Sequence, residues 1–235
     1  MNKAIIKALK FAFIQSVPVL FGYVFLGTAF GILLQKAGYN YIWALFTSLT
    51  VYAGSLQFVL VSFLSLGTAL TTVALMTLFI NSRHIFYGLS FIEKFKKMGK
   101  AYPYMVFSLT DETYSVLCSL KVPDGVSKNT VMFLIALLNH GYWVAGSVLG
   151  ALIGQIIPFD VTGIDFSMTA LFVVIFLEQW KVSKTHIPAL IGITSGIFFL
   201  VIFGPDNFLL PSLITTVILL TFCKPFVKLQ EDEIS

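Results

Sequence analysis

The sequence has few charged residues for its length. Of its 235 residues only 11% are Asp, Glu, Lys or Arg, whereas 57% are hydrophobic and the mean hydropathy is +0.91. A soluble globular chain carries roughly 25% charged residues. No polar stretch is long enough for a separate soluble domain. We therefore expect a membrane protein in which residues 1–235 form a single transmembrane domain.

Cysteines and enzyme motifs are also scarce. Cys118 and Cys223 lie in or beside apolar segments without metal-like spacing, so neither a disulfide framework nor a metal site is indicated. The patterns H-E-x-x-H, G-x-S-x-G and G-x-x-x-x-G-K-[ST] do not occur, which argues against an intramembrane enzyme and against ATP as the energy source. The net charge of +4 comes from lysines at the ends of apolar segments, which is typical of membrane retention and not of nucleic-acid binding. We expect no enzyme activity and no cofactor.

Long apolar runs fill most of the chain. A helix needs about 20 apolar residues to cross the hydrocarbon core, and its backbone satisfies its own hydrogen bonds there. About eight such segments are present, near 10–34, 41–66, 68–92, 104–120, 129–157, 166–180, 186–204 and 207–223. The prediction is an all-α polytopic membrane protein with about seven or eight transmembrane or re-entrant helices.

Lysine positions predict the orientation in the membrane. If the N-terminus is cytoplasmic and all eight segments cross, nine lysines lie inside and five outside, with Arg83 inside a span. Lysine and arginine are normally retained on the cytoplasmic side. However, the densest cluster, EKFKKMGK at 93–100, then lies outside. An early segment is therefore a candidate for a re-entrant helix.

Two glycine-rich stretches indicate an internal repeat. GYVFLGTAFG at 22–31 matches GYWVAGSVLG at 141–150, with a shift of 119 residues. Duplicated halves are common in secondary transporters, and we predict repeats at about 10–121 and 129–224. Alternatively, the glycine spacing simply allows close helix packing. The repeats are parallel if each half has four spans, and inverted if one segment in each half is re-entrant.

Polar residues interrupt four apolar segments, as YAGSLQF (52–58), NSRHIFYGLS (81–90), LTDET (109–113) and FLEQW (176–180), of which the last is typical of an interfacial anchor. An ionisable group at the bilayer centre costs about 2.5–3.5 kcal/mol on insertion scales, so such residues face a cavity or a partner. Gly54 and Ser55 mark a place where the helix can unwind and expose backbone groups to a zwitterion. The alternative is a tight helix crossing at which Ser55 and Gln57 bond across helices.

The charged residues have two interpretations. The Arg83 guanidinium can hold a carboxylate through two N–H bonds, either that of a substrate or that of Asp111. Asp111 and Glu112 are adjacent, so on a helix they point about 100° apart and one can pair while the other carries a proton. His84 is a second candidate proton carrier, or a neutral histidine within the bundle. Asn139 and His140 are gate residues or interhelical contacts.

The four motifs YAGSLQF, NSRHIFYGLS, LTDETYSV and GYWVAGSVLG, in this order, resemble the AzlC family of branched-chain amino-acid exporters. The resemblance implies efflux of leucine, isoleucine, valine and often methionine or analogues, energised by the proton gradient. It also implies a multi-pass protein of the plasma or inner membrane, paired with a small hydrophobic AzlD-type subunit. A homo-oligomer of that heterodimer is left open. Ser82 and Leu56 depart from the expected pattern, which bears on the substrate range.

The resemblance assigns roles to named positions. The substrate-binding candidates are Gly54, Ser55, Gln57, Asn81, Arg83 and Asp111. The proton-coupling candidates are Glu112, His84 and Asp111. Two other functions stay open: a passive amino-acid channel or facilitator, and a structural subunit whose small partner carries the site.

Overall fold

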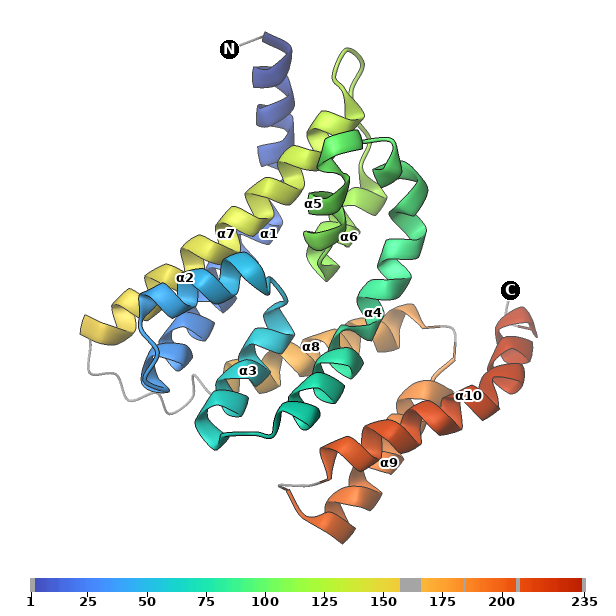
Figure 1. Cartoon of the computed structure of the whole chain (residues 1–235). Helices are drawn as coiled ribbons and strands as arrows, with labels where there is room; N and C mark the ends of the chain where they lie inside the picture. The colour runs from blue at the N-terminus through green and yellow to red at the C-terminus, as the bar shows by residue number, and fades with distance from the viewer. Residues whose placement is uncertain (1–2, 157–165, 184, 206–207, 234–235) are drawn as a thin grey trace. The chain divides into compact units, whose positions relative to one another are not determined.

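Helices make up the part of the chain that the computed structural model describes, residues 3–156, 166–183, 185–205 and 208–233, and no strand occurs among them. The elements are α1 (Lys3–Lys36), α2 (Tyr41–Thr50), α3 (Gly54–Leu66), α4 (Leu70–Lys96), η1 (Gly99–Ala101), α5 (Tyr102–Phe107), α6 (Asp111–Ser119), α7 (Lys128–Ile156), α8 (Phe166–Val182), α9 (Ile187–Phe203) and α10 (Leu209–Glu233) (Figure 1). The predicted all-α class is confirmed. Each predicted segment coincides with helix, and two segments are divided in the middle.

The chain forms two units. Unit 1 consists of Met1–Gly67 and Ile80–Met168, and unit 2 of Thr68–Phe79 and Thr169–Ser235. In unit 2, α9 packs against α10. All of the predicted site residues belong to unit 1.

Helices α1 and α7 form the main contact of unit 1, and glycines make it possible. A Cβ added to Gly150 would collide with the backbone of Thr28, and one added to Gly31 would collide with the backbone of Ser147. Only glycine lets two helix backbones approach so closely, as in small-residue packing within membranes. Close helix packing, the alternative explanation of the glycine spacing, is therefore present in the structure.

The two glycine stretches meet each other in register. Gly27 faces the backbone around Gly146, and a Cβ on Gly146 would lie 2.9 Å from the carbonyl oxygen of Tyr23. Residues with higher numbers on α1 contact residues with higher numbers on α7, so the two helices run in the same direction. The predicted duplication of whole halves stays a prediction, because this contact involves one helix of each half.

The segment predicted at 41–66 is two short helices. The break lies at Val51–Ala53, where Tyr52 has a left-handed φ of 41°, and α3 begins at Gly54. The predicted unwinding is thus placed directly before Gly54 and Ser55. With 10 and 13 residues, α2 and α3 are about 15 and 20 Å long, which is less than the hydrocarbon core of about 30 Å.

Contacts along α1 and α7 show that α3 turns back. At the break, the Tyr52 ring stacks on His140 in the middle of α7, with centroids 4.2 Å apart. One turn into α3, the Phe58 ring lies 6.0 Å from Phe30, which is closer to the C-terminal end of α1. The two helices therefore form a re-entrant hairpin that enters from the end of α1 at Lys36.

The segment predicted at 104–120 is a second interrupted helix. Helices α5 and α6 have 6 and 9 residues, or about 9 and 14 Å, so neither crosses the core. Thr110 ends the break as the N-cap of α6, where its Oγ1 accepts a hydrogen bond from the backbone N–H of Thr113 at 3.3 Å.

This second hairpin enters from the opposite end of unit 1. Met105 of α5 and Leu117 of α6 share one apolar cluster with Ala8 and Val131, at the starts of α1 and α7. The break between them reaches the middle of α1, where Thr110 bonds to the Tyr23 hydroxyl. The structure thus favours two re-entrant segments over eight full spans.

Within the described residues, α1 and α7 are the helices that meet both the length and the hydropathy of a membrane crossing, with mean hydropathies of 2.1 and 1.5. Helix α4 has 27 residues and is about 40 Å long, but it carries the polar NSRH stretch. The helices of the two hairpins, in contrast, are all too short to cross the core.

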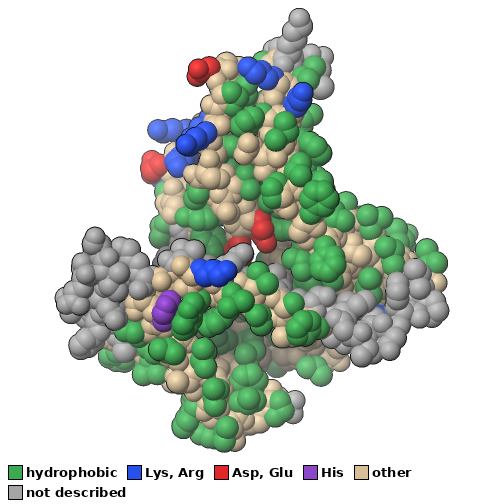
Figure 2. Space-filling view, turned by 180° about the vertical axis from the view of Figure 1, so that it is seen from behind, with side chains coloured by type: hydrophobic (Ala, Val, Ile, Leu, Met, Phe, Trp, Pro, Cys, Tyr) green, Lys and Arg blue, Asp and Glu red, His purple; other side chains and the backbone are tan. Residues whose placement is uncertain are grey.

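Most lysines of unit 1 lie at one end, whereas Lys36 lies at the other, at the end of α1. The start of α1, the end of α4 and the start of α7 share the apolar cluster, and Lys7 Nζ lies 3.4 Å from the carbonyl oxygen of Asp124. Figure 2 shows Lys and Arg side chains at the upper end above a largely hydrophobic surface. The cluster at 93–100 therefore lies beside the N-terminus, and not opposite to it as eight full spans require. The conflict with cytoplasmic retention of lysine disappears.

The glycine contact predicts an asymmetric response along α7. Replacing Gly150 by Ala forces the backbones of α1 and α7 apart, so we expect a loss of about 1–3 kcal/mol in the free energy of unfolding. Gly141→Ala is the matched control, because its added Cβ meets nothing within 4 Å. Thermal unfolding of the detergent-solubilised variants measures both effects. Equal stability of the two variants would contradict the contact.

The two hairpins predict a distinctive topology. In a chain whose native cysteines are replaced by serine, we expect Lys7→Cys and Lys97→Cys to react from the same face of the membrane. Leu66→Cys, at the end of α3, reacts from the other face. Eight full spans require the reverse for positions 66 and 97. Labelling of intact cells with an impermeant maleimide decides between the two arrangements.

Candidate functional site

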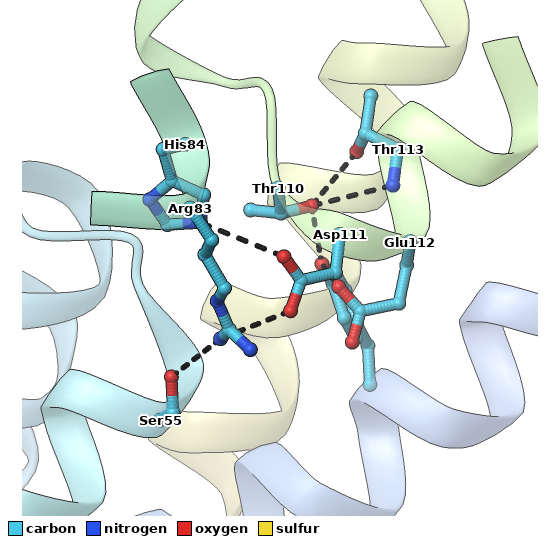
Figure 3. Close-up of polar contacts among 8 residues, drawn as sticks. Ser55, Arg83, His84, Thr110, Asp111, Glu112 and Thr113 are labelled. Carbon is cyan, nitrogen blue, oxygen red and sulfur yellow. Dashed lines mark hydrogen bonds and ion pairs between the residues drawn. The ribbon is translucent and has the colours of Figure 1, made fainter. Parts of the chain in front are cut away.

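An ion pair lies where the two hairpins meet α4. Arg83 of α4 places Nη2 2.9 Å from Oδ2 of Asp111, in the first turn of α6. The same Nη2 donates a hydrogen bond to Ser55 Oγ of α3 at 2.7 Å. Figure 3 shows these three side chains pointing toward one another. Residues predicted from three separate segments are thus brought together in one cluster.

His84 and Asn81 flank this pair on α4. His84 Nε2 lies 3.8 Å from Asp111 Oδ1, which is close enough for an electrostatic interaction but too long for a hydrogen bond. The Oδ1 atom of Asn81 is buried and has no hydrogen-bond partner among the described residues. His84 therefore lies near the pair, and Asn81 precedes Arg83 by two residues on the same helix.

The ion pair keeps one free donor and one free acceptor. Arg83 Nε and Asp111 Oδ1 are both buried and lack a hydrogen-bond partner in the described part of the chain. An unpaired buried polar group costs about 1–3 kcal/mol, so a guest that bonds to it is stabilised. The two side chains are each 26% exposed, so the pair is also partly accessible. The pair thus has unused hydrogen-bonding capacity on both its cationic and its anionic side.

Two helices begin in this region, and at the start of α6 the Thr113 N–H is already capped by Thr110 Oγ1. Ser55 is the second residue of α3 and Asp111 the first of α6. The first N–H groups of a helix have no internal partner, and the helix dipole makes this end partially positive. Helix starts therefore favour anions, carboxylates among them.

Glu112 turns to a different set of partners from Asp111. The Tyr23 hydroxyl donates to Glu112 Oε2 at 2.7 Å and lies 2.7 Å from Thr110 Oγ1. From Thr110 the hydroxyl contacts continue through Thr113 to Asn139 Nδ2, each at 3.1 Å. The expected divergence of the two acids is confirmed, because Asp111 faces the cation and Glu112 faces neutral hydroxyls.

Gly54 and Gln57 do not contact the ion pair. Gln57 is 0% exposed, and its Oε1 accepts from Trp143 Nε1 at 2.8 Å while its Nε2 donates to Ser48 at 3.3 Å. A Cβ on Gly54 would lie 3.2 Å from the Trp143 ring. These residues attach α3 to α7, which corresponds to the interhelical alternative. Their assignment as substrate ligands stays a prediction.

Several residues of the site were not predicted. Tyr23, Tyr52 and Thr110 carry hydroxyls at the two hairpin breaks, and the Tyr52 hydroxyl is buried without a described partner. Tyrosines within apolar runs are equally common in cores and at membrane interfaces, so composition gave no signal. The available signal for Tyr23 was the Gly-Tyr pair that opens the first glycine stretch, whereas Tyr52 and Thr110 lie within the polar stretches YAGSLQF and LTDET.

The fold and the site together define a helical integral membrane protein with polar residues converging inside it. The family profile described as "AzlC protein" matches residues 18–157, a range that contains the whole site. The "Branched-chain amino acid transport protein AzlC" of Bacillus subtilis is 38% identical over 222 residues, which cover 94% of this chain and 87% of that protein. This chain belongs to the AzlC family.

Other relatives are described as membrane proteins. An "Uncharacterized membrane protein" of Helicobacter pylori is 41% identical over 215 residues, covering 92% of this chain and 94% of that one. The "Inner membrane protein YgaZ" of Escherichia coli is 31% identical over 195 residues, covering 78% of each chain. No solved structure matches the chain. The membrane location predicted from composition is thereby supported.

Proposed function

We propose that this protein is a secondary active transporter that exports branched-chain amino acids across the plasma membrane in exchange for protons. The observation that carries the proposal is the Arg83–Asp111 pair, with one free donor and one free acceptor, at the meeting point of two re-entrant hairpins. Discontinuous helices whose N-termini face the substrate are a recurring way to build transporter sites.

A free amino acid is complementary to the pair. Its carboxylate accepts from Arg83 Nε and from the helix start at Ser55, since guanidinium and helix N-termini both favour carboxylates. Its ammonium group donates to Asp111 Oδ1. Because both charges of the zwitterion are neutralised by fixed groups, it can leave water at a depth where ions are otherwise costly.

The substrate class rests on the relatives. The Bacillus subtilis protein is named for branched-chain amino acid transport and aligns over nearly the whole chain. Leucine, isoleucine and valine are therefore the proposed substrates. The family resemblance also supports a small hydrophobic AzlD-type subunit as the partner in the membrane.

Glu112 is the proposed proton carrier. Its carboxylate accepts from the neutral Tyr23 hydroxyl, whereas Arg83 is engaged by Asp111. A carboxylate that is not paired with a fixed cation can take up a proton and release it again as its surroundings change. His84, 3.8 Å from Asp111, is the second candidate because a proton there changes the charge beside the substrate pair.

Removing the guanidinium tests the binding site. We expect Arg83→Ala to lower leucine affinity about 10- to 100-fold, because one charge-assisted hydrogen bond contributes about 1.5–3 kcal/mol. Lys94→Ala is the matched control on the same helix, since Lys94 is exposed beyond the site. Titration calorimetry of leucine with the purified variants measures the affinity. Unchanged binding by Arg83→Ala would remove this residue from the site.

Neutralising Glu112 tests the coupling. In proteoliposomes we expect Glu112→Gln to bind leucine within about twofold of the wild type but to lose uphill flux driven by an imposed pH gradient. Glu93→Gln, which changes an exposed acid that pairs with Lys96, is expected to keep that flux. If Glu112→Gln remains coupled, Asp111 or His84 is the carrier. If the wild type itself shows only downhill flux, the protein is a facilitator.

A further inference from the structure

One side chain of α7 bonds to both hairpins. His140 Nε2 lies 3.1 Å from the carbonyl oxygen of Ser48, near the end of α2. Its other nitrogen, Nδ1, lies 3.1 Å from the Tyr104 hydroxyl of α5. His140 is 8% exposed, so these two contacts use both of its polar atoms in a buried position.

The direction of these bonds follows from the partners. A carbonyl oxygen only accepts, so Nε2 carries a hydrogen and donates it to Ser48. In the neutral imidazole Nδ1 then accepts, and the Tyr104 hydroxyl donates to it. The neutral ring therefore connects a helix end of one hairpin to a side chain of the other.

Aromatic rings continue the same connection. Tyr52, at the tip of the α2–α3 hairpin, stacks on His140 with ring centroids 4.2 Å apart. Phe107, the last residue of α5, lies 5.7 Å from His140 and 6.1 Å from Tyr52. Tyr52 has φ of 41°, which is uncommon for a residue other than glycine and persists only when the surroundings hold it.

Each hairpin tip also carries a residue of the proposed substrate site. Ser55 follows Tyr52 by three residues, and Asp111 follows Phe107 by four. A hairpin that moves therefore moves its site residue with it. Transport by alternating access requires that the two sides open one at a time.

We propose that His140 is a positioning residue that links the two hairpins, so that when one swings open the other stays closed. This inference rests on the proposed function, because it assigns the two hairpins as gates of that site. Opening the α2–α3 hairpin breaks the bond to Ser48 while the bond to Tyr104 persists, and opening the α5–α6 hairpin does the converse. Loss of the link lets both hairpins open together and lets substrate leak.

The first test measures leak in proteoliposomes. We expect His140→Leu to bind leucine within about twofold of the wild type while the concentration gradient that it sustains falls at least fivefold. His140→Gln, whose amide can donate to Ser48 and accept from Tyr104, is expected to recover at least half of that gradient. Tyr104→Phe gives an intermediate loss. Tyr142→Phe is the control, since the Tyr142 hydroxyl contacts Ser16 of α1 and neither hairpin.

The second test needs no transport. Spin labels at Leu49→Cys and Val106→Cys, exposed positions near the two tips, report the separation of the hairpins in a chain without native cysteines. We expect a narrow distance distribution in the wild type and a distribution at least twice as broad in His140→Leu.

The outcomes distinguish a failure of the His140 link from a failure of the proposed transport function. An unchanged gradient or an unchanged distance distribution in His140→Leu overturns the link. So does a joint loss of folding and binding that His140→Gln fails to restore, because that marks a purely structural residue. A broadened distribution in a protein that moves no amino acid keeps the link and overturns the proposed function.

Discussion

The contact between the backbones of α1 and α7 is the constraint on which unit 1 depends. Any side chain larger than hydrogen at Gly31 or Gly150 collides with the opposite backbone, so the two helices fit in a single register. That register brings Tyr23 within 5.3 Å of the Trp143 ring, and it sets the depth at which both hairpins stop. The two helices thus form a rigid pair, and the polar residues of the hairpins pack against this pair.

A short stretch of α7 then supplies the partners that broken helices need. Asn139 bonds to α6, His140 to α2 and α5, and Trp143 to α3. Without water, an interrupted helix is tolerated only where its freed groups are satisfied by protein or by a hydrated cavity. The NHGYW sequence therefore explains how a membrane protein can hold two breaks at one depth and keep a charged pair between them.

The sequence predicted the helical class, the break beside Gly54 and the two partners available to Arg83, because each depends on local composition or on charge. It indicated a re-entrant helix among the early segments but left open whether segments 41–66 and 104–120 cross or turn back. An apolar run has the same composition whether it crosses or returns, and only contacts such as Phe58 with Phe30 distinguish the two. Tyr23 was missed for a related reason, since its hydroxyl gains significance from Glu112, which lies 89 residues away in the chain.

The position of α7 in the chain has a consequence for biogenesis. During synthesis both hairpins leave the ribosome before Asn139, His140 and Trp143, so the polar groups at the breaks have no α7 partner as they emerge. The hairpins therefore gain these hydrogen-bond partners only when α7 arrives. Assembly of the interior is thus a late step, governed by a helix made after the segments that it organises.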